Sequence, residues 1–221
     1  MSTETLEAPL AKPKEALLSK RRKKFITDPL NDDNPVTVQV LGICSALAVT
    51  TQMKPTMVMA ISVVFVMVFS NLLISLMRNL IPGRVRIIVQ LAVVATMVTL
   101  VNEVLKAYAF DMYKELAVFI GLIITNCIVM GRLEVFALAN KPYDSALDGL
   151  GSGLGYSWII LAVAFFREIW GSGKVFGYPV FEAIGFENFQ ANGLMVSPVG
   201  AFIVLGIIIW VQRTKTGYVE H

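Results

Sequence analysis

The sequence contains little histidine, cysteine or charge, and each shortage excludes a class of chemistry. Among its 221 residues the single histidine is His221, so histidine-based catalysis or metal ligation within an apolar segment is excluded. No Walker loop, dinucleotide-binding fingerprint or HExxH pair occurs. The usual motifs of phosphate-binding, dinucleotide-binding and zinc-dependent enzymes are therefore missing.

Long apolar runs dominate the chain instead. Hydrophobic residues make up 56% of it and charged residues 16%. A helix needs about 20 apolar residues to cross a hydrocarbon core of about 30 Å. The composition therefore predicts an all-α integral membrane protein that crosses the bilayer several times.

Six apolar runs are candidates for transmembrane helices. They cover residues 36–51, 56–77, 87–102, 116–139, 149–166 and 194–211. The first run is short and is followed by Pro55, and the fourth contains Gly131, Arg132 and Glu134. Broken helices at membrane depth occur where protein or a cavity covers the freed backbone groups. We therefore expect the first and fourth spans to be broken, and each of them contains one of the two cysteines.

A weak internal repeat relates these two spans. Superposing LGICSALAV on ITNCIVMGR places Cys44 over Cys127, and each cysteine then lies in the first of three consecutive spans. An odd number of spans per half would give the second half the opposite orientation, as in inverted-repeat transporters. We expect a membrane domain of residues 35–213, with halves at about 35–107 and 114–213. Such a fold would bring the two cysteines to face each other.

The segments outside this domain are expected to be cytoplasmic tails, 1–34 and 214–221. If the amino terminus is cytoplasmic, 14 of the 19 lysines and arginines lie on the inner side, as the positive-inside rule expects. Both termini would then be cytoplasmic. The basic run KRRKK, residues 20–24, is interpreted as an anchor at anionic lipid headgroups, and nucleic acid is not expected as a partner.

The glycine cluster DGLGSGLGYS, residues 148–157, has two possible interpretations. Glycine-rich segments can cradle phosphate, but this one opens an apolar span, where small residues let helices approach closely. Packing is the interpretation that we favour.

Three interpretations of the two cysteines remain open on the residues alone. Buried cysteine commonly behaves as a small hydrophobic residue. A disulfide would require an oxidising compartment. Two thiolates do not complete a tetrahedral metal site, and an iron-sulfur cluster generally takes four cysteines, so a cluster would need two more from another chain.

Several segments carry a resemblance to a known family. They are NPVTVQVLGICSALAVTT, MRNLIPGRVRIIVQLAVVATMVTLVNEVLKAY, VFIGLIITNCIVMGR and FFREIWGSGKVFG. Together they resemble the D subunits of the sodium-translocating NADH:quinone oxidoreductase, over about residues 34–211. LIITNCIVMGR is also similar, more loosely, to the sister E subunit and to subunits of the Rnf complex.

The resemblance implies a fold and a role. Members of this family have six spans in an inverted repeat with broken first and fourth helices, in the inner membrane of bacteria. Their complex has six subunits, so the partners implied here are A, B, C, E and F. The D and E subunits pair, and each contributes two cysteines to one [2Fe-2S] cluster. The matching positions in this chain are Cys44 and Cys127. Ser45 and Asn126, next to them in the sequence, are either hydrogen-bond donors to sulfur or ordinary polar contacts between helices.

The same resemblance implies that the chain is not catalytic alone. It would carry electrons within an enzyme, a translocase in which other subunits hold NADH and flavins, ubiquinone is reduced and Na⁺ is exported. Carboxylates near span ends are natural cation contacts, and the chain has Glu103, Asp111, Glu134 and Glu168 there. The ordinary interpretations of such carboxylates are snorkelling to the membrane interface and ion pairing, and Glu168 directly follows Arg167, which suggests a local pair. Our hypothesis is that Glu103 influences sodium release.

Two alternatives remain. One is the equivalent subunit of the Rnf complex, which couples ferredoxin to NAD. The other is a stand-alone secondary transporter, which the inverted repeat and the few intramembrane charges suggest. A transporter would work without iron and would tolerate Cys44→Ala.

Overall fold

The fold is described from a computed structural model, which describes residues 27–30, 34–108, 110–175, 178–179 and 193–216. The helices, in chain order, are η1 (Asp28–Leu30), α2 (Ile43–Val49), α3 (Met53–Met77), η2 (Gly83–Val85), α4 (Arg86–Tyr108), α5 (Phe110–Ile124), α6 (Cys127–Arg132), the π-helical η3 (Leu133–Ala137), α7 (Pro142–Ser172), α9 (Gly193–Val196) and α10 (Pro198–Thr216). Two short antiparallel strands, β1 (Lys174–Val175) and β2 (Tyr178–Pro179), follow α7. The described part is otherwise helical or irregular, which confirms the all-α prediction.

Among the described residues, four helical stretches are long and apolar enough to cross a membrane. They are Met53–Met77, Gly83–Tyr108, Val118–Ala137 and Pro142–Ser172. They match the predicted spans 56–77, 87–102, 116–139 and 149–166. The predicted span 194–211 corresponds to α9 and the shorter apolar helix α10, and in the predicted span 36–51 only the seven residues of α2 form a helix.

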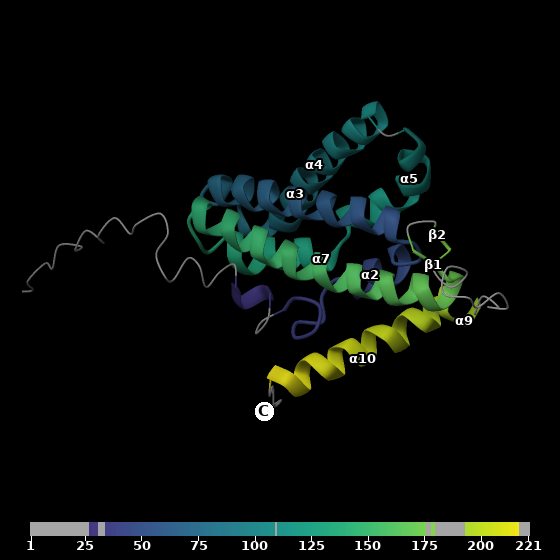
Figure 1. Ribbon diagram of the computed structural model, residues 1–221. Helices are drawn as coiled ribbons and strands as arrows, with labels where there is room; N and C mark the ends of the chain where they lie inside the picture. Colours follow the sequence, from purple (N-terminus) through teal and green to yellow (C-terminus); the bar gives the residue numbers. More distant parts are fainter. Residues whose placement is uncertain (1–26, 31–33, 109, 176–177, 180–192, 217–221) are drawn as a thin grey trace, which may run out of the picture.

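Helices α3 and α7 form the centre of the molecule and run side by side in opposite directions (Figure 1). Two hydrogen bonds show that the two helices are antiparallel. At the start of α3 the Met53 amide donates to Glu168 near the end of α7, and toward the end of α3 Asn71 donates to the carbonyl of Ser145 near the start of α7. In Figure 1, α4 and α5 lean away from this pair, and α10 lies on its other side.

The glycine cluster of α7 lets α3 approach closely. A Cβ atom added at Gly149 would lie 2.8 Å from Nδ2 of Asn71, and one added at Gly153 would lie 3.2 Å from Cα of Val64. Side chains at these positions would push the two helices apart. The packing interpretation of this cluster is confirmed.

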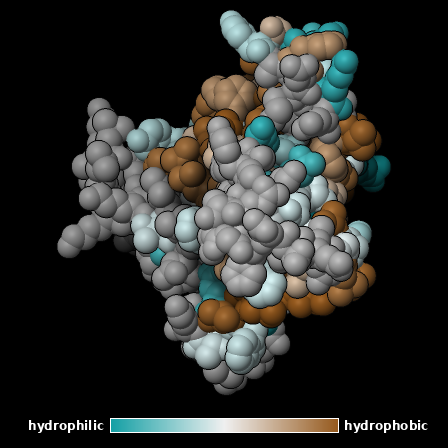
Figure 2. All heavy atoms as spheres, turned by 45° about the vertical axis from the view of Figure 1, so that its right-hand side comes forward, coloured by the Kyte–Doolittle hydropathy of each residue, from teal (hydrophilic) through white to brown (hydrophobic). Residues whose placement is uncertain are grey.

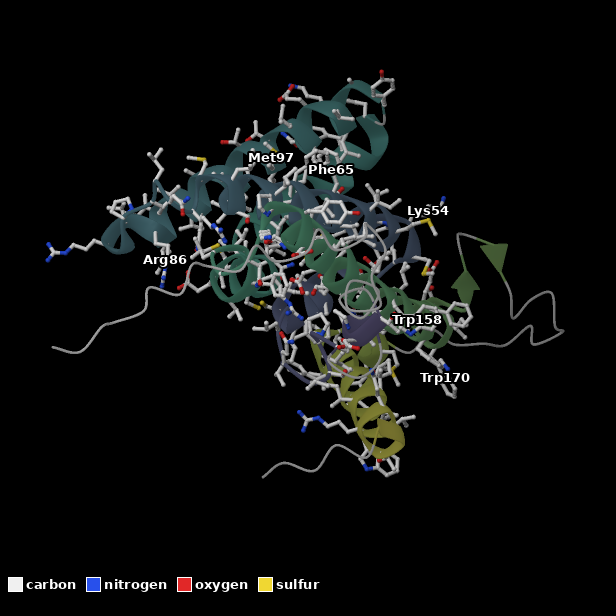
Figure 3. The ribbon with its side chains drawn as sticks, turned by 90° about the vertical axis from the view of Figure 1, so that its left-hand side faces the viewer. Lys54, Phe65, Arg86, Met97, Trp158 and Trp170 are labelled. Atoms are coloured by element: carbon white, nitrogen blue, oxygen red, sulfur yellow. The ribbon has the colours of Figure 1, made fainter. Side chains whose placement is uncertain are left out.

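The outer surface is strongly apolar. Figure 2 shows hydrophobic side chains over much of the visible described surface, and Ile61, Ile88 and Trp158 each expose 65% or more of their area. A soluble monomer rarely exposes so much apolar surface, whereas lipid tails cover it at little cost. In Figure 3, Lys54 at the start of α3 and Arg86 at the start of α4 lie toward opposite ends of the molecule.

Candidate functional site

The two cysteines are brought together although 83 residues separate them in the chain. Their Sγ atoms lie 4.0 Å apart. Both thiols are free, because a disulfide would require about 2.05 Å between the sulfurs. Cys44 is exposed on this chain and Cys127 is half-buried, so the pair opens toward one side of the described structure.

Each cysteine lies at the beginning of a short helix that follows a break. Cys44 is the second residue of α2, which begins after Gly42, a residue in the left-handed conformation with φ 81°. Cys127 is the first residue of α6, which begins after Asn126. The Asn126 backbone is extended, which ends α5, and its side-chain oxygen accepts a hydrogen bond from the Ile128 amide. An asparagine cap thus restarts the helix.

A backbone amide contacts one of the two sulfurs. The N–H of Gly42 donates to Sγ of Cys127 over 2.9 Å. The conformation of Gly42 makes this contact possible, because residues with a side chain rarely adopt φ near +80°. A Cβ atom here would also lie 2.9 Å from Cε2 of Tyr156.

The predicted donors Ser45 and Asn126 do not reach sulfur. Instead the Ser45 hydroxyl donates to the carbonyl of Gly42 over 2.9 Å and accepts from Nδ2 of Asn126 over 3.2 Å. It also lies 2.7 Å from the hydroxyl of Tyr156. Nothing in the sequence pattern singled out Tyr156, except that it is the one aromatic residue in the glycine cluster.

A buried arginine holds the far end of α2. The guanidinium of Arg167, on α7, donates to the carbonyl of Leu47 over 3.3 Å and to Oγ1 of Thr50 over 2.7 Å. Its remaining donors bond three carbonyls ahead of α10, those of Met195, Val196 and Ser197. All five guanidinium N–H groups therefore have acceptors.

The predicted pair between Arg167 and Glu168 is wrong. Glu168 turns instead to the start of α3, where its carboxylate accepts from the Met53 amide over 2.8 Å. Neighbouring residues on a helix point in different directions, so each side chain binds a different segment.

Among the described residues, no other predicted carboxylate is grouped with the thiols. Glu134 forms an ion pair with Arg86 and accepts from Gln90 over 3.0 Å. Glu103 is exposed on α4, and within the described part of the chain it has no hydrogen bond or ion pair. The side chain of Asp111 and the basic tail 1–26 lie outside what the structure describes.

The thiol pair offers two metal ligands and no more. Among the described residues, no group of three or more histidine, cysteine, aspartate or glutamate side chains lies close enough to hold a metal ion. A tetrahedral centre at this pair would therefore need ligands from outside the described part of this chain.

Comparisons with known proteins place the chain in a family. Residues 22–209 match the family model described as "Rnf-Nqr subunit, membrane protein". A relative from Pasteurella multocida is 53% identical over 204 residues, which are 91% of this chain and 98% of the relative. One from Proteus mirabilis is 52% identical over 207 residues, covering 92% and 98%. One from Photorhabdus laumondii is 51% identical over 206 residues, covering 91% and 98%.

All three relatives are named as the D subunit of a Na(+)-translocating NADH-quinone reductase. The identity extends along nearly the whole of each relative. The resemblance found in the sequence is thereby confirmed. The chain belongs to the Rnf-Nqr family of membrane subunits, among the D subunits of the Na⁺-translocating NADH-quinone reductase.

Proposed function

We propose that this chain is the D subunit of a sodium-pumping NADH:quinone reductase and that Cys44 and Cys127 supply half of the ligands of an intramembrane [2Fe-2S] cluster. The 4.0 Å between their sulfurs carries the proposal. Two thiolates on one tetrahedral metal, with metal–sulfur bonds of about 2.3 Å, lie about 3.8 Å apart. The observed separation fits that arrangement.

The exposure of the pair supports a shared centre. Cys44 is exposed on the chain alone, so the pair is accessible to a second chain. Two further cysteines from a partner, most directly the E subunit, would complete the usual set of four. When bound, such a cluster accepts and gives up one electron at a time. This chain's part is to hold two ligands, orient them and donate the Gly42 amide to one sulfur.

The inverted repeat is part of the same proposal. Each cysteine-bearing short helix precedes a long helix, α2 before α3, and α6 with η3 before α7. The two long helices run in opposite directions, as halves of opposite orientation require. A six-span arrangement with both termini in the cytoplasm of a bacterial inner membrane agrees with the charge distribution.

We infer sodium export from the names of the relatives. Glu103 is the residue of this chain to which we assign a role in that export. Glu134 and Glu168 already have partners in the described structure, whereas Glu103 is exposed and has none there. The relatives also favour the NADH:quinone reductase over the Rnf complex, since all three carry the former name.

The proposal is tested by iron analysis and electron paramagnetic resonance (EPR) on the purified complex. Cys44→Ala and Cys127→Ala should each remove the cluster signal. A stand-alone transporter would keep its activity in both variants and in the absence of iron.

A further inference from the structure

The Ser45 hydroxyl is the centre of a buried network behind the two thiols. It has one proton, which goes to the carbonyl of Gly42. The nearby hydroxyl of Tyr156 must therefore donate to it, and Nδ2 of Asn126 donates to it as well. Ser45 thus uses its one donor and both of its acceptor sites.

Two members of this network are sequence neighbours of the two candidate metal ligands. Ser45 follows Cys44 directly, and Asn126 directly precedes Cys127. Gly42, which receives the Ser45 proton on its carbonyl, donates its own N–H to Sγ of Cys127. The network therefore holds the carbonyl of Gly42, together with the Ala46 amide, and so helps to set the orientation of the residue whose amide contacts sulfur.

Because the residues of this network are buried, losing any of these hydrogen bonds would cost free energy. Tyr156, Ser45 and Asn126 expose 1% of their surface or less. Water does not reach a lost partner there, so an unmade hydrogen bond leaves a buried polar group unsatisfied. Tyr156 comes from α7, whose glycine-rich face is packed on α3, so its hydroxyl is held by the rigid centre of the fold.

We propose that Tyr156 is a positioning residue for the thiol pair. Tyr156 acts through Ser45 to hold the Gly42 amide on Cys127, and it thereby raises the reduction potential of the metal centre. This inference rests on the proposed function. A hydrogen bond to a ligating sulfur stabilises the more negative, reduced state of a cluster more than the oxidised state. Weakening it makes the cluster harder to reduce.

The test is a redox titration followed by EPR on the purified complex, comparing wild type with Tyr156→Phe. The phenyl ring preserves the packing against Gly42, and only the hydroxyl is lost. We expect the iron content to stay near that of wild type and the reduction equilibrium constant to fall at least threefold. For a one-electron couple this is a lowering of the potential by about 28 mV or more. The EPR line shape should change as well.

Ser45→Ala provides a second, independent variant. It removes the same connection between Tyr156 and Gly42, so it should lower the potential in the same direction. Because both changes break one path, the double variant should shift the potential by less than the sum of the single shifts. Tyr143→Phe is the matched control, since Tyr143 is exposed on the first turn of the same helix, and it should leave potential and spectrum unchanged.

An unchanged potential and spectrum in Tyr156→Phe would overturn the inference, even if the iron content fell, because a merely structural role changes occupancy and not potential. Cys44→Ala, measured in the same series, separates the two claims. If it keeps the full cluster signal, the proposed function fails. If it loses the signal while Tyr156→Phe matches wild type, only the positioning role fails.

Discussion

The amide nitrogen of Gly42 lies 2.9 Å from Sγ of Cys127, a residue 85 positions farther along the chain. This contact joins the segment before α2 to the start of α6, the two places where apolar segments are broken.

The first prediction concerns Gly42. Gly42→Ala would force a Cβ to within 2.9 Å of the Tyr156 ring in a left-handed conformation that alanine avoids. We expect iron bound per complex to fall by more than half.

The control for this change is Gly121→Ala. A Cβ at Gly121, in α5, has no heavy atom within 4 Å, so iron content should remain at the wild-type level. Iron determination on both variants checks the prediction. Wild-type iron in Gly42→Ala would mean that the left-handed turn does not set the position of the thiols.

The second prediction concerns the contact between α3 and α7. Gly149→Ala would place a Cβ 3.1 Å from the Met67 carbonyl oxygen and closer still to the Asn71 amide. Overpacking of this kind typically costs about 1–3 kcal/mol, which outweighs the gain of up to about 1 kcal/mol in helix propensity. We expect a lower thermal transition of the detergent-solubilised complex.

Gly206→Ala, in α10, serves as the control for Gly149→Ala, because nothing lies within 4 Å of its Cβ. It should leave the thermal transition unchanged or raise it slightly. Equal transitions in the two variants would contradict the role assigned to the glycine-rich face.

The third prediction concerns Arg167. Its five N–H groups meet carbonyls and a hydroxyl from α2 and from the segment ahead of α10. Lysine has three donors on a single atom and cannot reach both segments, so Arg167→Lys should destabilise the chain by on the order of 3 kcal/mol. Limited proteolysis of membranes should then cleave the variant faster than wild type.

Arg84→Lys, at an exposed position in η2, should not change the cleavage rate. If Arg167→Lys resisted proteolysis as wild type does, the guanidinium would not be holding these segments together.

The fourth prediction concerns sodium. Glu103→Gln removes an exposed carboxylate on α4 while keeping the shape of the side chain. We expect the sodium concentration for half-maximal turnover to change at least threefold, because a carboxylate is a natural cation contact. Turnover measured against sodium concentration checks it, and an unchanged sodium dependence would rule out the role of Glu103.

The helical core could be predicted from the sequence because hydropathy alone specifies it. The run 56–77 and helix α3 end at the same residue, and the glycines before Tyr156 indicated close packing in advance. The sequence also predicted broken first and fourth spans, from Pro55 and from the charged residues near Gly131, but in the structure Pro55 lies in the first turn of α3 and Gly131 lies within α6. In the structure the second break lies earlier, at Asn126, since a side-chain cap decides where α6 begins.

The polar contacts around the thiols could not be predicted, because they depend on the tertiary fold. Ser45 and Asn126 stood out as neighbours of cysteine, yet both turn away from sulfur and meet each other. The donor to sulfur is a backbone amide, which no sequence pattern marks. Arg167 and Glu168 are adjacent in sequence, but helix geometry sends them to different segments.

The most direct test of the account is the EPR signal and iron content of the purified complex with either cysteine replaced. Cys44→Ala and Cys127→Ala should each abolish the signal of one [2Fe-2S] cluster and release its iron, while Met130→Leu, at a sulfur-containing side chain in the same short helix as Cys127, should retain both. The full signal and full iron content in both cysteine variants would contradict the central claim that these two thiols hold the cluster.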